Sequence, residues 1–212
     1  MNLKQLYEFL EHDAKNAGLN LIKQGILRTI YSKLYPHYCY KYICLLRYKS
    51  FYESRNSILS KILSRIYSIK LHRLGAKLGF YIPRDVFGPG LYIPHTGSII
   101  VNSNARVGKN CQINNNGVIG QNKGKSPVIG DNVFIGPGAV VSGDVYIADN
   151  VWIGANAVVT HNIDTPNALV GGIPAKVIGV KNQNWVQEFD MYKVKWIYLC
   201  IALLGNDRGF IL

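Results

Sequence analysis

Several features that would place a protein in a membrane or in a disulfide framework are absent from this sequence. No apolar run approaches the roughly 18 residues that a membrane span needs; the longest, residues 196–204, is about half that length. Residues 1–5 lack the apolar core of a signal peptide. The cysteines show neither metal-binding spacing nor a dense disulfide pattern: Cys39, Cys44, Cys111 and Cys200. We therefore expect a cytoplasmic protein with no metal site.

Acidic residues are scarce, with 12 Asp and Glu against 24 Lys and Arg. The imbalance is confined to residues 1–79, which hold 14 basic and 4 acidic residues, whereas residues 80–180 hold 6 and 5. No nucleic-acid motif or run of consecutive Lys and Arg accompanies the charge, so nucleic acid is not an expected partner. A solvated basic face on packed helices is the preferred interpretation. Weak attraction to the inner face of the membrane is the alternative.

What the sequence does contain is a period of six residues. One aliphatic series recurs at Ile129, Ile135, Val141, Ile147, Ile153 and Val159, and extends back through Val101, Val107, Ile113 and Ile119. A second series follows four residues after each member: Val133, Ala139, Val145, Val151, Ala157 and Ile163. A period of six fits neither a helix nor a simple strand. It predicts a parallel β-solenoid in which each hexad supplies one short strand, one turn and an inward aliphatic side chain.

The chain divides into three expected parts: a helical segment at 1–79, the solenoid at 80–180 and an apolar tail at 181–212. Within the first part we expect helices from Asn2 to about Asn16, over residues 21–35, from about Pro36, and over residues 55–78. The last of these carries an apolar stripe and basic residues on its remaining surface. The stripe comprises Leu59, Ile62, Leu63, Ile66, Leu74 and Leu78. We expect it to pack on the preceding helices or on a neighbouring subunit. The tail is expected to form a short packed helix, with contact to a membrane surface as the alternative.

The repeat is interrupted once. Ten residues separate Ile119 from Ile129 where six are expected, so about four residues are extruded as a loop. In a solenoid such insertions gather on the binding face. Lys123 and Lys125 can meet an anionic ligand there, although two lysines on an exposed loop are more often just solvated.

The segment Gly171-Gly172-Ile173-Pro174-Ala175-Lys176 ends the repeat. Hexads closed in this way resemble the hexapeptide-repeat acyltransferases. With His95-Thr96-Gly97-Ser98 and the loop after Ile119-Gly120, the chain is most similar to the serine acetyltransferase branch, and within it to the enzymes of capsule and exopolysaccharide gene clusters. The resemblance covers roughly residues 80–180.

The resemblance implies a left-handed parallel β-helix, mainly β in class, with three hexads per coil and three subunits around an axis. It also implies active sites between subunits and acetyl-CoA as the acetyl donor. The cofactor-binding residues implied are Gly120, Asn122, Lys125, Pro137, Ala155 and Lys176. Small residues let the pantetheine arm approach the backbone, and lysine can meet a phosphate. Tight corners favour small residues in any case, so both explanations remain open.

His95 is the expected catalytic base, because acetyl transfer to a hydroxyl needs a group that accepts a proton near neutral pH. His161 is the reserve candidate. The match to serine acetyltransferases is incomplete: Pro94 stands where they place an aspartate, and the loop lacks their Arg-His pair. The aspartate that orients their histidine is replaced by Phe80 or Tyr81, with Asp85 as the nearest acidic substitute.

These departures direct the expectation toward a sugar hydroxyl, acetylated during surface polysaccharide synthesis, as the acceptor. Asn114, Asn115 and Asn116 lie about one coil after His95 and are the expected substrate-binding residues, unless they only fill a corner. The alternatives are a serine O-acetyltransferase of cysteine synthesis and an inactive trimeric scaffold.

Overall fold

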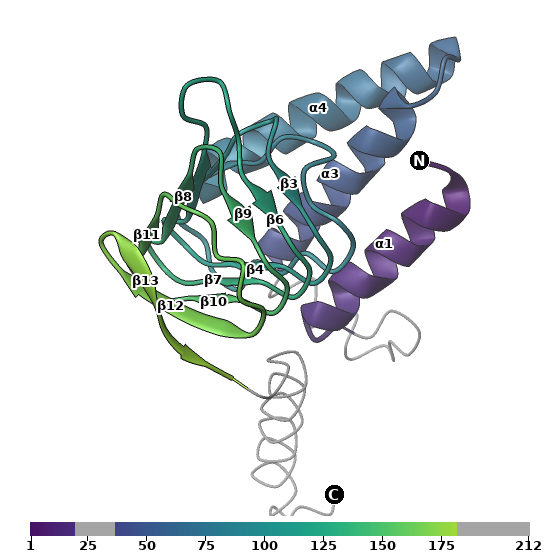
Figure 1. The fold of residues 1–212 in the computed structure, drawn as a ribbon. Helices are drawn as coiled ribbons and strands as arrows, with labels where there is room; N and C mark the ends of the chain where they lie inside the picture. The colour runs from purple at the N-terminus through teal and green to yellow at the C-terminus, as the bar shows by residue number, and fades with distance from the viewer. Residues whose placement is uncertain (20–36, 182–212) are drawn as a thin grey trace, which may run out of the picture.

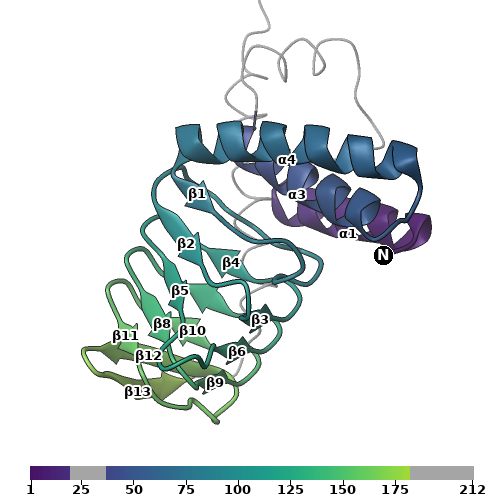
Figure 2. The same ribbon diagram turned by 90° about the horizontal axis from the view of Figure 1, so that it is seen from above.

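Parallel strands wind into the three faces of a prism, and three helices lie across the end of the prism where the coils begin (Figures 1 and 2). A computed structural model describes residues 1–19 and 37–181. The expected helix at 21–35 and almost all of the apolar tail lie outside the described residues. In the described part, the expected parallel β-solenoid with a helical N-terminal segment is confirmed.

Each face of the prism is one sheet, and we name each by its outward side chains or its size. The valine face contains β1 Phe80–Tyr81, β2 Ile99–Val101, β5 Val118–Gly120, β8 Val140–Ser142 and β11 Val158–Val159. The three-stranded face contains β3 Arg106–Val107, β6 Val128–Ile129 and β9 Tyr146–Ile147. The aromatic face contains β4 Gln112–Ile113, β7 Phe134–Ile135, β10 Trp152–Ile153, β12 Ala168–Gly172 and β13 Ala175–Val180.

The three edges between these faces carry the turns. The histidine edge joins the aromatic face to the valine face and contains residues 94–98, 114–117, 136–139 and 154–157. The loop edge joins the valine face to the three-stranded face and contains residues 82–85, 102–105, 121–127, 143–145 and 160–162. The asparagine edge carries a ladder of left-handed asparagines, in which Asn110 donates to Asn132 at 3.0 Å and Asn132 donates to Asn150 at 2.9 Å.

The six-residue series forms the core of the coils. Ile113, Ile135 and Ile153 stack in register on the aromatic face, and Val101, Ile119, Val141 and Val159 do so on the valine face; all are 0–1% exposed. Members of the second series, such as Val133 and Ala157, are also buried. The hexads therefore point two aliphatic side chains each into one continuous core. Cys111, which follows Val107 by four residues and so falls in the phase of the second series, lies among them, and burial raises the pKa of its thiol far above the ordinary range.

Helix α1, Leu3–Asn16, begins where the sequence predicts. Asn2 accepts from the backbone of Gln5, and the Gln5 side chain accepts in return from the backbone N–H of Asn2. This capping box satisfies two donors at the helix start. Leu6, Leu10 and Ala14 are the buried apolar residues of the helix.

Helices α3, Tyr38–Glu53, and α4, Ile58–Leu78, pack on each other, and α3 also contacts α1. Helix α4 begins later than expected because Ser57 caps it by accepting from the backbone of Ser60. It buries Ser60, Ser64, Leu71, Gly75 and Leu78, a side composed mostly of small residues.

The expectation that the apolar stripe of α4 packs on the preceding helices is wrong for three of its six members, and packing on a neighbouring subunit stays a prediction. Leu59, Ile62 and Ile66 are 66%, 51% and 41% exposed. Small residues allow a helix to approach its neighbours more closely than bulky ones do. Ser60, Ser64 and Gly75 are buried, with Gly75 against Phe80 of β1 and Tyr42 of α3, and the isoleucines point outward. Among the described residues, no helix combines the length and apolar character needed to cross a bilayer.

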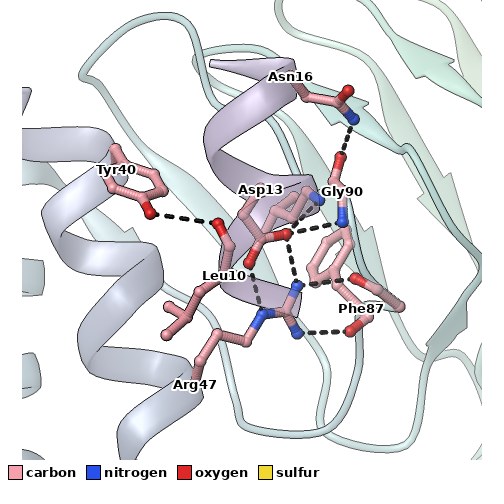
Figure 3. A network of polar contacts seen from close by, with 9 residues as sticks. Leu10, Asp13, Asn16, Tyr40, Arg47, Phe87 and Gly90 are labelled. Carbon is pink, nitrogen blue, oxygen red and sulfur yellow. Dashed lines mark hydrogen bonds and ion pairs between the residues drawn. The ribbon is translucent and has the colours of Figure 1, made fainter. Parts of the chain in front are cut away.

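A buried polar network attaches the helices to the first coil (Figure 3). Arg47 of α3 donates to Asp13 of α1 at 2.8 Å and to the backbone carbonyls of Phe87 and Gly88 at 2.8 and 2.7 Å. Asp13 also accepts from the backbone N–H groups of Gly90 and Leu91. The pair is 4% and 0% exposed. These bonds satisfy backbone groups of the first coil that have no coil above them to pair with.

Candidate functional site

The histidine edge brings together several of the sequence-predicted site residues. Gly97, two residues after His95, lies directly over Asn115, because a Cβ on Gly97 would come within 2.9 Å of the Asn115 Cβ. The carbonyl of Asn115 accepts from Gly138, and that of Pro137 accepts from Asn156, which places Pro137 and Ala155 in the next two coils. The edge thus carries His95, Asn115, Pro137 and Ala155 in successive coils.

The β12–β13 hairpin closes the same edge. Ile153 pairs with Val170, so the chain after Val170 turns where Gly154 and Ala155 turn one coil earlier. Lys176 pairs with Gly171 just beyond this turn, and its side chain is exposed. The row from His95 to Lys176 spans five strand spacings, about 24 Å at ~4.8 Å each.

The backbone around His95 is fixed by the end of α4. Gly79 ends that helix in a left-handed conformation. Gly97 donates to the carbonyl of Leu78 at 3.0 Å, and Ile99 donates to that of Gly79 at 2.9 Å. Gly97 has φ 134°, which side-chain-bearing residues rarely adopt, so the turn requires glycine. The His95 side chain is exposed, and the edge as defined contains no carboxylate that would orient it.

The asparagines that follow one coil later have different roles. Asn114 is 5% exposed and donates to the carbonyl of Ile135 at 2.9 Å, so its expected contact with a substrate is wrong: it fills the corner. Asn115 is half-buried, and Asn116 is exposed with φ 60°. Only Asn115 and Asn116 remain candidates for contacts beside His95.

The predicted loop lies between β5 and β6 on the loop edge and projects beyond the coils (Figure 1). Asn122 and Lys125 exchange backbone hydrogen bonds of 2.9 and 3.0 Å, with Lys123 and Gly124 both at positive φ. This is the geometry of a two-residue hairpin turn. Ser126 Oγ is 3.0 Å from Asn102 Oδ1, which ties the base of the loop to the preceding coil. The extruded residues therefore form a defined hairpin.

Charged side chains gather on the loop edge. Lys125 forms an ion pair with Asp144 of the next coil, and the hydrogen bond and charge of Asp144 raise the pKa of the lysine. Arg106, which the sequence analysis overlooked, is fixed one coil above the loop: its Nη1 donates to the carbonyls of Ser103 and Ala105 at 3.2 and 2.8 Å. Its position was readable, because it directly precedes Val107 of the hexad series and so faces outward.

The two edges are separate within one chain. The valine face lies between them. Gly120 at the end of β5, with Asn122 and Lys125 on the loop edge, therefore does not approach His95, Pro137 and Ala155 on the histidine edge. His161 and Asp85 also lie on the loop edge, where Asp85 pairs with Arg84 at 3.3 Å. Asp85 is therefore not the partner of His95 in the same chain. Phe80 is buried and Tyr81 projects from the valine face. Neither side chain therefore takes over the role of the aspartate that orients the histidine in serine acetyltransferases.

Three cavities of about 510, 660 and 930 Å³ lie among the helices and the first coils. Neither His95 nor a residue of the loop lines any of the three. The second is lined by Tyr81, His72, Arg84 and Arg106, among others. In one described chain these cavities do not enclose the expected catalytic residue. Among the described residues there is also no cluster of three or more His, Cys, Asp and Glu side chains.

The coils match a known protein family over part of their length. Residues 126–161 match the bacterial transferase hexapeptide repeat, described as six repeats. These residues run from the base of the loop to the turn after β11 and include β6 to β11.

Two curated relatives share sequence with about half of the chain. A probable serine acetyltransferase of Oryza sativa subsp. japonica is 39% identical over 114 residues, which are 51% of this chain and 33% of the relative. The serine acetyltransferase of Mycobacterium tuberculosis is 36% identical over 103 residues, 46% of this chain and 44% of the relative. The chain thus spans less than half the length of these curated relatives.

Solved structures share the fold more widely than the sequence. The serine acetyltransferase of Brucella abortus in complex with coenzyme A covers 85% of this chain and 70% of its own, with a TM-score of 0.65 at 19% identity. The Neisseria gonorrhoeae enzyme in complex with serine covers 84% and 70%, with a TM-score of 0.62 at 23% identity. The coils of this chain are therefore hexapeptide repeats of the bacterial-transferase kind, wound as the left-handed parallel β-helix that this chain shares with serine acetyltransferases.

Proposed function

We propose that the protein is an acetyl-CoA-dependent O-acetyltransferase, with residues 80–180 as its catalytic part. The observation that carries the proposal is the histidine edge, where His95, small exposed residues and Lys176 form one row along the coils. The row offers a base at one end, backbone open to a pantetheine arm at Pro137 and Ala155, and a cation for a phosphate at the other end.

In the proposed reaction His95 accepts the proton of the acceptor hydroxyl as its oxygen attacks the thioester carbonyl of acetyl-CoA. The new carbon–oxygen bond becomes the ester bond, and the carbon–sulfur bond of the thioester breaks. The proton on His95 then passes to the departing CoA sulfur. No covalent enzyme intermediate is needed, because the row presents the donor beside the base.

The proposed assembly is a homotrimer formed through the valine face. The outward positions of this face are Tyr81, Ile100, Val118, Val140 and Val158, paired strand to strand in an unbroken apolar stripe. Tyr81 and Ile100 are 69% and 49% exposed. A flat apolar stripe of this kind suits burial against other subunits. Three copies can bury it together around a three-fold axis.

This assembly completes the site. When three prisms turn their valine faces toward one axis, the histidine edge of each lies beside the loop edge of the next. Gly120, Asn122 and Lys125 of one copy then border His95 of its neighbour. The same contact presents Asp85 and Asp144 as candidates for orienting His95, which has no carboxylate on its own edge. The separation of the predicted residues in one chain follows from a site shared between two.

L-Serine is the proposed acceptor, because the curated relatives named above are serine acetyltransferases. The absence of an Arg-His pair in the loop does not oppose serine as strongly as the sequence suggested. Arg106, held by two backbone carbonyls on the loop edge, supplies the fixed cation that a substrate carboxylate needs.

A sugar hydroxyl in surface polysaccharide synthesis is the second candidate. It is favoured by Asn115 and Asn116, whose amides lie one coil below His95 at the opposite end of the row from Lys176, where a neutral pyranose is easily accommodated. The relatives favour serine, so the sugar takes second place.

The deciding experiment measures thiol release from acetyl-CoA with the full chain, supplying L-serine, D-serine or a panel of nucleotide sugars. We expect turnover with L-serine at millimolar concentration and little with D-serine. Turnover on a nucleotide sugar alone would install the second candidate. A folded protein that turns over none of these acceptors, and that shows no acetyl-CoA binding by calorimetry, would favour the inactive scaffold.

A further inference from the structure

The outer side of α4 carries a stripe of exposed apolar residues that nothing in the described chain covers. This exposed stripe shares only Leu59, Ile62 and Ile66 with the stripe expected from the sequence. Ile58, Leu59, Ile62, Ile66 and Ile69 are 80%, 66%, 51%, 41% and 53% exposed. The isoleucines recur at spacings of three and four residues, which places them on one side of a helix. Scattered exposed apolar residues are ordinary, but five on one side of one helix form a patch.

The charge around this stripe has one sign. Residues 58–78 contain five Lys and Arg and no Asp or Glu. At 3.6 residues per turn, Lys61 and Arg65 lie along one flank of the stripe, and Lys70 and Lys77 lie along the other. Arg73 continues the line of the stripe itself. An aliphatic centre flanked by cations is typical of helices that lie in the plane of a membrane surface.

The inner side of the helix explains why the stripe is left outside. Ser60, Ser64, Leu71 and Gly75 are buried, and α4 contacts α3 and β1. A Cβ on Gly75 would lie 2.7 Å from the carbonyl oxygen of Phe80, so this position tolerates no larger residue. Helix α4 also lies across the end of the coils (Figure 2), at the opposite end of the prism from β13.

The positive charge of α4 decides whether a second copy of the chain or a lipid surface covers the stripe. A second copy packed through the same side would bring ten cations together with no anion on either helix, and such like-charge contact is unfavourable. An anionic lipid surface supplies the opposite charge at the flanks and an apolar layer at the centre. We propose that α4 binds the protein to anionic membranes, lying flat with its isoleucines at the headgroup boundary and its lysines and arginines among the lipid phosphates.

The test is co-sedimentation of the full chain with vesicles of phosphatidylcholine alone or mixed with phosphatidylglycerol. We expect binding to the mixed vesicles, little to the neutral ones, and weaker binding as salt rises. Ile62→Asn with Ile66→Asn should reduce binding at least tenfold. Lys61→Gln with Arg65→Gln and Arg73→Gln should reduce it about a hundredfold, since each cation near an anionic surface contributes about fivefold.

The matched control removes the same net charge elsewhere. Lys4, Lys41 and Lys109 are exposed on other elements, and changing all three to Gln should leave most of the binding. Circular dichroism and L-serine turnover in solution confirm that each variant is folded, and they separate this proposal from the proposed function, which neither variant of α4 should affect.

Three outcomes would overturn the proposal. Equal losses in the control and the α4 charge variant would show a general attraction of a basic protein. A particle mass that falls in solution with the Ile62 and Ile66 changes would show a contact between copies. Loss of binding in Trp196→Asp, with the α4 variants unaffected, would assign the membrane contact to the tail.

Discussion

His95 lies in a turn whose backbone is fixed by other elements while its side chain stays exposed. The end of α4 accepts two backbone hydrogen bonds from this turn, from Gly97 and Ile99, and Gly97 itself lies against Asn115 in the next coil. The imidazole is therefore carried on a rigid base at the start of the proposed acetyl-CoA row. Such placement favours a catalytic group, because proton transfer depends on position as well as on basicity.

His95→Ala should lower kcat by about 10²–10⁴, the usual contribution of a general base. Steady-state thiol release measures the loss, and light scattering checks that the assembly is intact. His12→Gln, on the exposed side of α1, serves as the control. Wild-type turnover in a folded His95→Ala variant, with loss in His161→Ala, would transfer the role to the reserve histidine.

Asp13 and Arg47 illustrate a different use of charge. Asp13→Ala leaves the Arg47 guanidinium buried without its carboxylate and removes the acceptor for Gly90 and Leu91. Breaking a buried pair in this way should lower the free energy of unfolding by about 3–5 kcal/mol. Urea denaturation measures it. Glu53→Ala, which breaks the half-exposed pair with Arg84, should cost only about 0–1 kcal/mol; equal losses would contradict the assigned role of the network.

The Cys44 thiol predicts how stability changes at alkaline pH. Burial, as the largest cause, raises its pKa to about 11 from an ordinary value near 9. Above pH 9 the unfolded thiol loses its proton while the folded one keeps it, so the folded state binds more protons and stability falls as pH rises. The fall belongs to the window between about pH 9 and 11.

Denaturation curves across that pH window should show that the free energy of unfolding declines less in Cys44→Ala than in the wild type. Tyr40, whose pKa burial also raises, contributes to the background decline in both proteins. Identical slopes in the two proteins would contradict the buried thiol as a cause.

At the scale of elements, the loop between β5 and β6 is separable from the coils. Removing the residues from Asn122 to Lys125 restores the six-residue spacing between Ile119 and Ile129. Because these residues hydrogen-bond to one another in a hairpin, the coils should keep their stability while turnover is lost. Thermal unfolding and thiol release measure the two effects. Activity that survives the excision would remove the loop from the site.

The helices differ from the loop in being bound to the coils by burial. Tyr42 of α3 is 2% exposed, contacts Phe80 of β1 with ring centroids 5.2 Å apart, and accepts from the backbone of Ile82. With the Asp13–Arg47 network, these contacts cover the open end of the first coil. A β-solenoid without such a cap would expose unpaired backbone groups and apolar core.

At the scale of the whole molecule, the shared site makes a prediction about mixtures. His95→Ala and the loop-excised variant are each expected to be inactive alone. When unfolded together and refolded as mixed trimers, a site is intact where the histidine edge of an excised chain meets the loop of a His95→Ala chain. In a ring of randomly mixed chains this holds for about a quarter of the sites. Recovery of about that fraction supports the shared site, and complete absence of recovery contradicts it.

The valine face can be tested in the same assembly. Val118→Lys with Val140→Lys would place two cations in the proposed interface, and burying unpaired charge is costly. The trimer should dissociate in light scattering and lose turnover. Val128→Lys with Tyr146→Lys makes the matched change on the three-stranded face, where both residues are about half exposed. Dissociation by the control pair alone would place the interface on that face.

The sequence by itself determined the coils, because the inward position of a hexad depends only on local strand and turn geometry repeated along the chain. The series from Val101 to Val159, the buried Cys111, the extruded loop and the cap of α1 at Asn2 were all predictable. The histidine edge was only partly predictable. Pro137 and Ala155 lie 18 residues apart, which is one coil of three hexads, but 42 residues separate His95 from Pro137, two more than two coils and the four-residue insertion account for.

Only the tertiary structure decided the rest, because it depends on which surfaces are covered. A six-residue period does not say which edge a turn belongs to, so only the structure shows that Lys125 and His95 lie on different edges of one chain, with the valine face between them. Aliphatic spacing in α4 predicted a buried stripe, yet close packing against α3 and β1 selected the side with Ser60, Ser64 and Gly75. Asn114 turned inward because the carbonyl of Ile135 lies within hydrogen-bonding distance of its amide. The hexads indicated that Arg106 faces outward, but only the structure shows that the carbonyls of Ser103 and Ala105 hold its guanidinium.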